Sequence, residues 1–388
     1  MLTHQKHLFS LDENITYING AYMSPQLKTV EEAGLKAIVR KNQPTSITQT
    51  DFFTDRKRLK QKFAQLIEAP DYQNCAIIPS VSYGIATVAK NIHLSEGDEI
   101  LIVDEQFPSN VYAWREIIKT SKAVIRIVNA PEIKENRGSL WNEAILDAIS
   151  PKTKVVAMGH IHWADGTLFD LVSIRKKATE VGAKLIIDGT QSVGALPFSV
   201  KEIQPDALIC GGYKWLMGPY AIGMAYYADT FNDGDPLEYN WMNRKNSEDF
   251  SQLINYQDEY QPKADKYCVG ESSNFILVPM QIAAIDQLLE WGQDAIQEYT
   301  DHISAKAIGA LRSKGCFIEE DAYRSKHLFG IYPQETMDME VLKERFRESG
   351  ISVGIRGKAI RVAPHLYNTE ADFEKLVSCF FKKKIINT

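Results

Sequence analysis

The chain has 388 residues, which is long for a single hydrophobic core, so two domains are expected. Its 44% hydrophobic and 24% charged residues are typical of a globular protein. The net charge of −6 argues against a nucleic-acid partner, because neutralising phosphates requires a basic surface. A small-molecule partner is expected instead.

The first residues, MLTHQKHLFSLDENITYING, contain neither the apolar core of a signal peptide nor a charged leader. No later stretch approaches the roughly 18 apolar residues of a transmembrane helix. We therefore predict a soluble, cytoplasmic protein with no membrane partner. The five cysteines are scattered and are expected to be reduced core thiols. His160 and His162 have no further ligand near them in sequence, so no metal site is predicted.

From about residue 74 to 227, apolar runs rich in β-branched residues alternate with segments of helical period. In chain order the runs are CAIIPS, EILIVDE, AVIRIVN, KVVAMGHIHW, AKLIIDGT, DALICGG and IGMAYYA. Because the runs are continuous rather than alternating, the strands should be buried on both faces. The pattern predicts a doubly wound α/β domain with a mostly parallel sheet. Its ligand should bind outside the carboxyl ends of the strands.

The remainder of the chain predicts a smaller α+β domain. A polar, irregular segment over 228–275 is expected to form a loop over the site, and a long helical pattern then ends at Gly315. Strand-like, helical and hairpin segments follow, namely CFIEED, HLFGIYP, DMEVLKERFRESG, ISVGIRGKAIRVAP and EADFEKLVSCFFKKK. The predicted domains are a large one over 16–285 and a small one over 286–388 with residues 1–15.

Two polar residues stand directly after buried strands. Lys214 lies in GGYKWLMGP after DALIC, and Asp188 follows AKLII. Burial lowers the pKa of an amine and prepares it to attack a carbonyl. A pyridoxal phosphate enzyme needs such a lysine for its Schiff base and an acid that keeps the pyridine nitrogen protonated. The pair therefore points to pyridoxal 5′-phosphate.

The stretches DGTQSVGALPFSV and PDALICGGYKWLMGP resemble the cofactor core of the class V aminotransferase family. This family of fold type I pyridoxal phosphate enzymes includes cysteine desulfurases, kynureninases and isopenicillin N epimerase-like proteins. The resemblance runs from YINGAYMSP to IRVAPHLYNT. It implies a fold type I transferase with a large cofactor-binding domain, a smaller C-terminal domain and a homodimeric assembly.

The resemblance also implies roles around the cofactor ring. Lys214 would form the Schiff base, Asp188 would pair with the pyridine nitrogen, and Gln191 would reach the ring 3-hydroxyl. Phe107, in DEQFPSNVYAW, stands where the family has the aromatic residue that stacks on the ring. Core packing is the alternative interpretation of Phe107.

Further positions match the family's phosphate ligands. Tyr213 stands just before the lysine, and in PSVSYGIATVA the residues Val81 and Ser82 would bind the phosphate at a helix N-terminus. Ser82 could instead be a plain N-cap. Ser272, in GESSNF, would reach the phosphate of the neighbouring subunit, and Trp241 is either a second cross-subunit contact or a surface aromatic residue.

The motif IRVAPHLYNT resembles the family's carboxylate-binding motif and makes Arg361 the clamp for the α-carboxylate of an amino acid substrate. A guanidinium suits this role because its planar fork forms two parallel bonds to a carboxylate. Arg356 is a weaker candidate for a functional role. An ordinary surface arginine is the alternative interpretation of both.

Several reactions remain open. A desulfurase needs a nucleophilic cysteine on a mobile loop ahead of the arginine motif, and no cysteine stands between Cys316 and Arg361. Phe107 and Tyr213 favour a kynureninase, but Gln191 stands where kynureninases tend to carry histidine. The main prediction is an aminotransferase acting on a small amino acid, with a related epimerase or lyase as the alternative.

Two hypotheses from other functional classes fit the sequence less well. A non-catalytic pyridoxal phosphate-binding protein would not need the complete set of Lys214, Asp188 and Arg361. A nicotinamide-dependent dehydrogenase requires Gly-x-Gly-x-x-Gly after the first strand, and CAIIPS is not followed by it.

Overall fold

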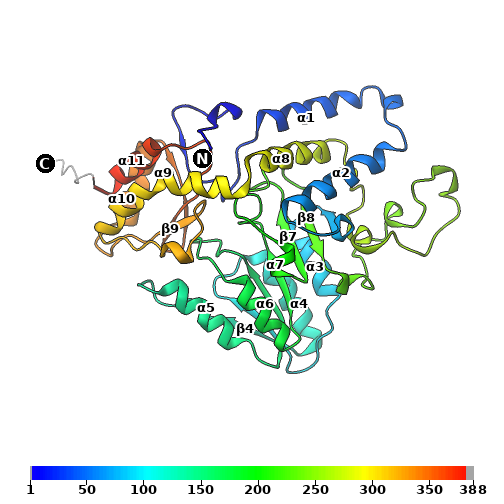
Figure 1. Ribbon diagram of the computed structural model, residues 1–388, viewed down its shortest axis with the longest axis horizontal. Coiled ribbons are helices and arrows are strands. Elements are labelled where there is room, and N and C mark those ends of the chain that lie inside the picture. Colours follow the sequence, from blue (N-terminus) through cyan, green and yellow to red (C-terminus); the bar gives the residue numbers. More distant parts are fainter. Residues whose placement is uncertain (1, 382–388) are drawn as a thin grey trace.

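A computed structural model describes residues 2–381 and shows a central seven-stranded sheet surrounded by helices (Figure 1). The strand order is β2-β8-β7-β6-β5-β3-β4. β8 runs antiparallel to both its neighbours, whereas the paired strands from β7 to β4 run parallel. The strands are β2 (Cys75–Ile78), β3 (Glu99–Val103), β4 (Val124–Val128), β5 (Thr153–Gly159), β6 (Lys184–Asp188), β7 (Ala207–Gly211) and β8 (Gly223–Tyr227). Each predicted apolar run forms one strand, and the mostly parallel sheet is confirmed.

Helices follow the strands of the large domain, and polar caps fix where several of them begin. The Ser80 hydroxyl caps α3 by accepting a hydrogen bond from the Tyr83 N–H at 3.2 Å. Asp170 caps α6 in the same way, accepting from the Ser173 N–H at 3.0 Å. These helices are α3 (Val81–Lys90), α4 (Tyr112–Ser121), α5 (Arg137–Ala148), α6 (Leu171–Glu180) and α7 (Val200–Ile203).

The predicted long helix after residue 276 is two helices, α8 (Leu277–Trp291) and α9 (Gln293–Ser313). Gly292 separates them with φ of +77°, a left-handed conformation that favours glycine. α8 packs against α1 (Lys28–Arg40) and α2 (Asp51–Leu66), whereas α9 packs against α11 (Glu370–Phe381). The predicted boundary at residue 285 thus falls inside a helix, and we propose Gly292 as the boundary. Among residues 2–381, no helix combines the length and apolar character needed to cross a bilayer.

The C-terminal domain contains an antiparallel sheet in the order β11-β12-β9. Its elements are β9 (Phe329–Ile331), α10 (Met339–Glu348), β10 (Ile351–Ser352), β11 (Gly354–Arg356), β12 (Ala359–Val362) and α11. The predicted hairpin is confirmed. CFIEED forms no strand, and only an isolated bridge joins Phe317 to Tyr332. Residues 382–388 of the predicted domain lie outside the described residues.

The N-terminal segment joins this C-terminal domain. β1 (Thr16–Tyr17) pairs in parallel with β10, and the Gln5 N–H donates to the Leu366 carbonyl at 2.7 Å. The association therefore extends past residue 15, to at least Tyr17. It also places the following segment, with Asn19 and Ala21, between the two domains, where the Gly20 N–H donates to the Ala363 carbonyl at 3.1 Å.

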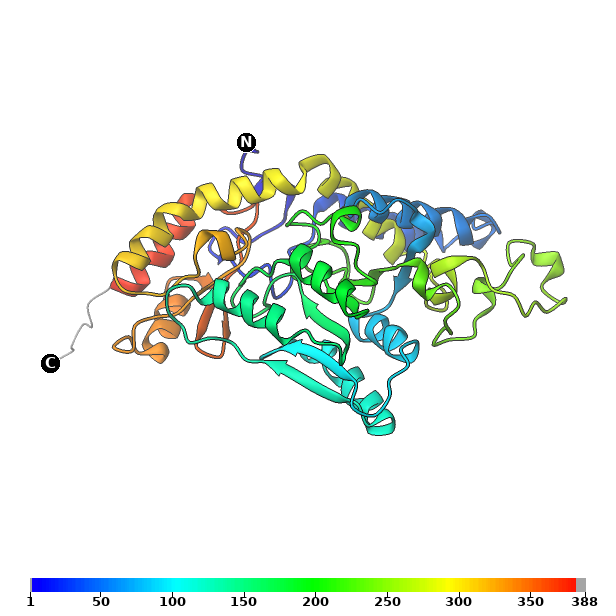
Figure 2. The same cartoon turned by 60° about the horizontal axis from the view of Figure 1, so that its bottom comes forward.

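The segment 228–275 projects from one end of the molecule, opposite the C-terminal domain (Figures 1 and 2). An aromatic cluster anchors it to α2, because the Phe52 ring lies 6.1 Å from Trp241, 5.3 Å from Phe250 and 5.0 Å from Phe275. Its short 3₁₀ turns are Asp229–Phe231, Trp241–Asn243, Phe250–Gln252 and Lys263–Tyr267. The expectation that this segment covers the site of its own chain is wrong, because none of its residues lines the cavity described below.

A buried charge network joins the two domains. The Asp165 carboxylate lies 3.1 Å from Arg137 Nη2 and accepts hydrogen bonds from the Thr167 N–H at 3.1 Å and the Tyr332 hydroxyl at 2.7 Å. The Gly330 N–H donates to the Asp165 carbonyl at 2.7 Å, so the same residue also holds β9. Every acceptor of this buried carboxylate is thereby used, as a buried charge requires.

We expect Asp165→Ala to lower the free energy of unfolding by about 3–5 kcal/mol, because Arg137 loses its closest buried partner. Burial raises the pKa of Asp165, but His162 and Arg137 more than offset this, so its pKa lies below the ordinary value. The stabilisation should therefore be present above about pH 4 and be lost as the pH falls further. Urea denaturation at several pH values measures both effects.

Asp147→Ala is the matched control, because Asp147 is an exposed carboxylate on α5, the helix that begins with Arg137. Its effect should stay within about 0.5 kcal/mol. Equal stabilities for the two variants at pH 7 would show that the Asp165 network contributes nothing to folding.

Candidate active site

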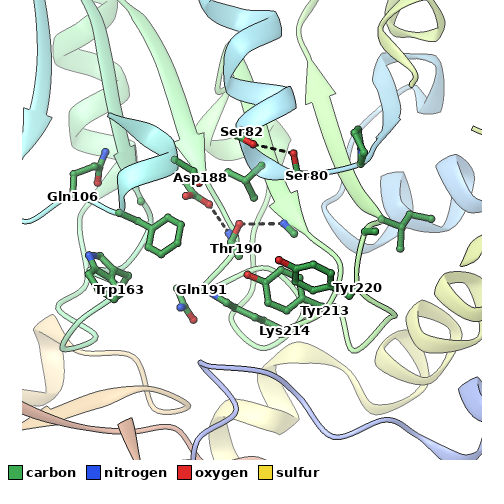
Figure 3. Close-up of a pocket in the computed structure, with 18 of the residues that line it drawn as sticks. Ser80, Ser82, Gln106, Trp163, Asp188, Thr190, Gln191, Tyr213, Lys214 and Tyr220 are labelled. Carbon is green, nitrogen blue, oxygen red and sulfur yellow. Dashed lines mark hydrogen bonds between the residues drawn. The ribbon is translucent and has the colours of Figure 1, made fainter. Parts of the chain in front are cut away.

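A cavity of about 290 Å³ lies at the carboxyl edge of the parallel strands (Figure 3). It is lined by Pro79, Ser80, Val81, Ser82, Gln106, Phe107, Ser109, Gly159, Ile161, Trp163, Asp188, Thr190, Gln191, Gly211, Tyr213, Lys214, Tyr220, Ala221 and Ile222. These residues follow β2, β3, β5, β6 and β7 or precede β8. The position agrees with the expectation for an open α/β sheet, and the volume lies at the small end for ligand sites.

Asp188 is the last residue of β6, level with Gly159 of β5 and Ile209 of β7. Its carboxylate accepts a hydrogen bond from the Thr190 N–H at 3.0 Å, and the Thr190 hydroxyl in turn accepts from the Gly211 N–H at 3.1 Å. Burial raises the pKa of Asp188, although Thr190 and Lys214 oppose the shift. A carboxylate in such a place is stabilised by a bound cation, which fits a protonated pyridine nitrogen.

Lys214 follows β7 in a turn that is closed by the Met217 N–H donating to the Lys214 carbonyl at 2.9 Å. Its Nζ lies 5.3 Å from the Phe107 ring centroid and 5.6 Å from that of Tyr213. Within the described part of the chain, this amine has no hydrogen-bond or ion-pair partner. Burial lowers its pKa to about 8; Asp188 opposes the shift, and the positive charges of Arg361 and Arg356 add to it. The amine is therefore prepared to react as a nucleophile near neutral pH.

Gln191 is held in a defined orientation at the cavity wall. Its side-chain amide donates to the Ala21 carbonyl at 3.0 Å, and its carbonyl oxygen accepts from the Trp215 indole N–H at 3.0 Å. One amide hydrogen remains for a ligand. Tyr213 and Tyr220 lie side by side, with ring centroids 4.7 Å apart, and both line the cavity as Figure 3 shows.

The N-terminus of α3 opens on the cavity with Val81 and Ser82 as its first two residues. Ser80, and not Ser82, is the N-cap, so the alternative reading of Ser82 as a plain cap is wrong. The two hydroxyls lie 3.0 Å apart. Unpaired N–H groups at this end of the helix, together with two hydroxyls, form a site that favours an anion such as a phosphate.

Arg361 lies beside the cavity without lining it. The residue is only 1% exposed, and its Nη1 donates to the carbonyl of Trp163, a lining residue, at 3.0 Å. Its Nε and Nη2 are buried without a hydrogen-bond partner, and no acidic side chain among the described residues pairs with it. Burial and the charge of Arg356 lower the pKa of Arg361 to about 10, although Tyr17 opposes the shift. Because a buried cation without a partner is unfavourable, Arg361 is suited to bind an anionic ligand.

Ser272 stays a predicted contact for the phosphate of a neighbouring subunit. It is 1% exposed, its hydroxyl is buried without a partner, and it lies outside the cavity lining. The exposed residues of this turn are Glu271 and Asn274. Trp241 belongs to the aromatic cluster on α2 and is also remote from the cavity lining.

The structure adds site residues that the sequence did not identify, among them Ser80, Gln106, Thr190 and Tyr220. Only their position in the sequence could have identified them, because each lies within a few residues of a strand end. Trp163 comes from the segment HIHWADG, which directly follows β5. His160 packs against Phe198 and lies outside the lining, as does His162, which contacts Asp165. Within residues 2–381, no three His, Cys, Asp or Glu side chains gather as metal ligands.

The family described as Aminotransferase class-V matches residues 38–376. The chain belongs to the class V aminotransferase family. An uncharacterized aminotransferase of Bacillus subtilis (strain 168), YcbU, is 26% identical over 89% of this chain and 86% of its own length. The isopenicillin N epimerase of Streptomyces clavuligerus is 22% identical over 82% of this chain and 81% of its own.

Solved structures confirm the fold type I architecture of this class V chain. The cysteine desulfurase CsdA of Escherichia coli superposes with a TM-score of 0.78 at 19% identity, covering 96% of each chain. A C-DES mutant with glycine covalently linked to its pyridoxal phosphate cofactor gives 0.85 at 17% identity, covering 97% of this chain and 98% of its own. The cofactor of the class V fold is pyridoxal phosphate, and the residues present fit it, because an unpaired amine, a half-buried carboxylate and a helix N-terminus meet in one cavity.

In the cofactor-free protein, the Lys214 amine should lose its proton near pH 8, well below the usual value of about 10.4. Its labelling by trinitrobenzenesulfonate, followed across pH by peptide mapping, should therefore rise with a midpoint near 8. Arg361→Gln should move the midpoint upward, because one positive charge near the amine disappears. The other lysines of the same digest are the reference, and a Lys214 midpoint near 10.4 would contradict the lowered pKa.

Proposed function

We propose that the protein is a pyridoxal phosphate-dependent aminotransferase that acts on a small amino acid. The observation that carries the proposal is the isolated Lys214 amine, which lines one cavity with Asp188 and interacts electrostatically with the buried Arg361 cation. The bound cofactor supplies an electron-withdrawing ring that weakens the bond between Cα and its hydrogen. The residues of the chain would bind, orient and move protons around it.

Cofactor binding would be divided between two ends of the cavity. Asp188 would stabilise the positive charge on the ring nitrogen, and Gln191 would donate its remaining amide hydrogen to the ring hydroxyl. The Phe107 ring would cover one face of the cofactor ring. At the other end, Val81, Ser82 and Tyr213 would hold the phosphate at the α3 N-terminus. These roles agree with where each residue lies in the cavity lining.

Lys214 would be both the attachment point of the cofactor and the base that removes the Cα proton. Its pKa of about 8 leaves a useful fraction of neutral amine at physiological pH. The other titratable side chains of the cavity lining are Asp188, Tyr213 and Tyr220. Asp188 would be engaged with the ring, and phenols are poor bases at neutral pH. A single base acts on one face of the substrate only and therefore does not invert the configuration at Cα, which favours transamination over epimerisation.

The lining offers no thiol. The five cysteines are buried and free, and none of them lines the cavity within the described chain. A desulfurase mechanism that uses a cysteine nucleophile is therefore not supported by this cavity. Arg361, with two unused donor nitrogens, would bind the α-carboxylate of the substrate.

Incubation of the holoenzyme with single amino acids and a 2-oxo acid tests the reaction. We expect mass spectrometry to find the oxo acid of the donor together with a new amino acid. Asp188→Asn should slow this exchange by about 100-fold or more, because a neutral amide does not stabilise a charged ring nitrogen. Release of sulfide, or formation of the D-amino acid as the main product, would replace transamination by lyase or epimerase chemistry.

A homodimer forms part of the proposal. Leu35, Ile38 and Val39 form a stripe on α1 and are 57%, 53% and 63% exposed, although the opposite side of α1 packs on α8. An apolar stripe at helical spacing on an otherwise polar helix supports contact with another molecule. A second copy of the chain is the simplest occupant.

We expect sedimentation of the wild-type protein to give the mass of a dimer and Ile38→Glu to shift it toward the monomer. Placing a charge in an apolar interface costs its desolvation, so dissociation should be visible at micromolar concentration. Leu140→Glu, at a residue 42% exposed on α5, is the control and should leave the mass unchanged. A monomeric wild-type protein with bound cofactor would contradict the assembly.

A further inference from the structure

Two arginines on one hairpin lie against Trp163, a residue of the cavity lining, without lining the cavity themselves. Arg356 ends β11 and Arg361 lies in β12, and the hairpin pairs Arg361 with Gly354. A Cβ atom at Gly354 would lie 3.2 Å from Arg361 Nε, so the glycine leaves room for this guanidinium. The Trp163 ring centroid is 5.6 Å from the Arg356 Cζ and 5.9 Å from the Arg361 Cζ. Both cations therefore lie against a ring that lines the cavity.

No acidic side chain neutralises either arginine within the described residues. Arg361 donates to one backbone carbonyl and keeps Nε and Nη2 unpaired. Arg356 donates from Nη1 to the carbonyl of its neighbour Ile355 at 2.7 Å and forms no ion pair. Glu105, whose carbonyl accepts the Trp163 indole N–H at 2.6 Å, is exposed and forms no ion pair with either arginine.

Arg356, Arg361 and Lys214 interact electrostatically. The charge of Arg356 contributes to the lowered pKa of Arg361, and both charges contribute to the lowered pKa of Lys214. Such shifts require that the three cationic groups lie close together. Like charges at close range in a partly desolvated site are unfavourable until a ligand brings negative charge.

A single bound carboxylate would neutralise only one of the two arginines. The α-carboxylate that Arg361 would bind rests on the proposed function, and the phosphate of the cofactor is expected at the α3 N-terminus. Arg356 then remains without an anion. We propose that the substrate carries a second anionic group on its side chain, that Arg356 binds this group, and that the substrate class is the short acidic amino acids.

The size and chemistry of the site support this assignment. A cavity of about 290 Å³ that also holds the cofactor leaves room for a short side chain. The guanidinium of Arg356 is partly exposed and has Nε and Nη2 available, so it can form two parallel bonds to a carboxylate. A neutral amide of the same shape would leave Arg356 uncompensated, which is the physical basis for discrimination.

Binding of amine-free acids to the holoenzyme tests two-anion recognition without any reaction. We expect calorimetry to show that glutarate binds about 10- to 100-fold more tightly than butyrate. Arg356→Gln should remove most of this preference, and Arg356→Lys should keep part of it, because lysine retains the charge without the fork. Lys358→Met is the matched control, since it removes an exposed charge at the turn of the same hairpin, and it should keep the full preference.

Turnover of glutamate and aspartate against glutamine and asparagine separates this inference from the proposed function. We expect kcat/KM to favour the acids, and Arg356→Gln to reduce the acids more than the amides. Equal use of acids and amides, with Arg356→Gln affecting both alike, would overturn the inference while leaving an aminotransferase. No transamination of any amino acid, with Arg356-dependent glutarate binding intact, would overturn the proposed reaction and leave the second anion site. Equal binding of glutarate and butyrate to the wild-type holoenzyme would overturn the second anion site.

Discussion

The register of β5, β6 and β7 is the constraint on which the site depends. It sets Gly159 level with Asp188, and Asp188 level with Ile209, so that the residues after each strand meet at one edge. A slip of one residue would turn the Asp188 side chain to the opposite face of the sheet. The strands are buried and apolar on both faces, and this burial holds the register far more firmly than any contact within the site.

The structure contains two sets of buried charged residues, the Asp165 network and the pair Arg361 and Lys214. The first set stabilises the fold, whereas the second set is suited to bind a ligand. The Asp165 carboxylate has a cation, two hydroxyls and one backbone N–H around it, so its charge is compensated by the protein. Arg361 and Lys214 have no hydrogen-bonded or ion-paired partner of this kind among the described residues, although both are buried. Proteins retain uncompensated buried charges mainly where binding or catalysis uses them. The two groups are also connected, because the segment held by Asp165 carries Trp163, whose carbonyl orients Arg361.

Local patterns in the sequence predicted the features that depend on local interactions. The apolar runs predicted the seven strands, and Lys214, Asp188, Gln191, Tyr213 and Phe107 all reach the cavity because each follows a strand end. The features that depend on tertiary packing could not be predicted from the sequence. Ser272 is buried by its own chain, an aromatic cluster with Phe52 holds segment 228–275 away from the cavity, and Gly292 breaks a helical pattern that is otherwise continuous.

The short hairpin between β11 and β12 supports the proposed charge recognition and offers no loop for a nucleophilic cysteine. Its turn consists of Gly357 and Lys358, so the strand that carries Arg361 follows Arg356 almost immediately. There is no length of chain in this turn that could bring a thiol over the cavity. Cys316 is buried behind the C-terminal sheet, where the neighbouring Phe317 bridges to Tyr332. The hairpin holds two guanidinium groups against Trp163, and under the proposed second anion site the selectivity should follow from negative charge on the substrate.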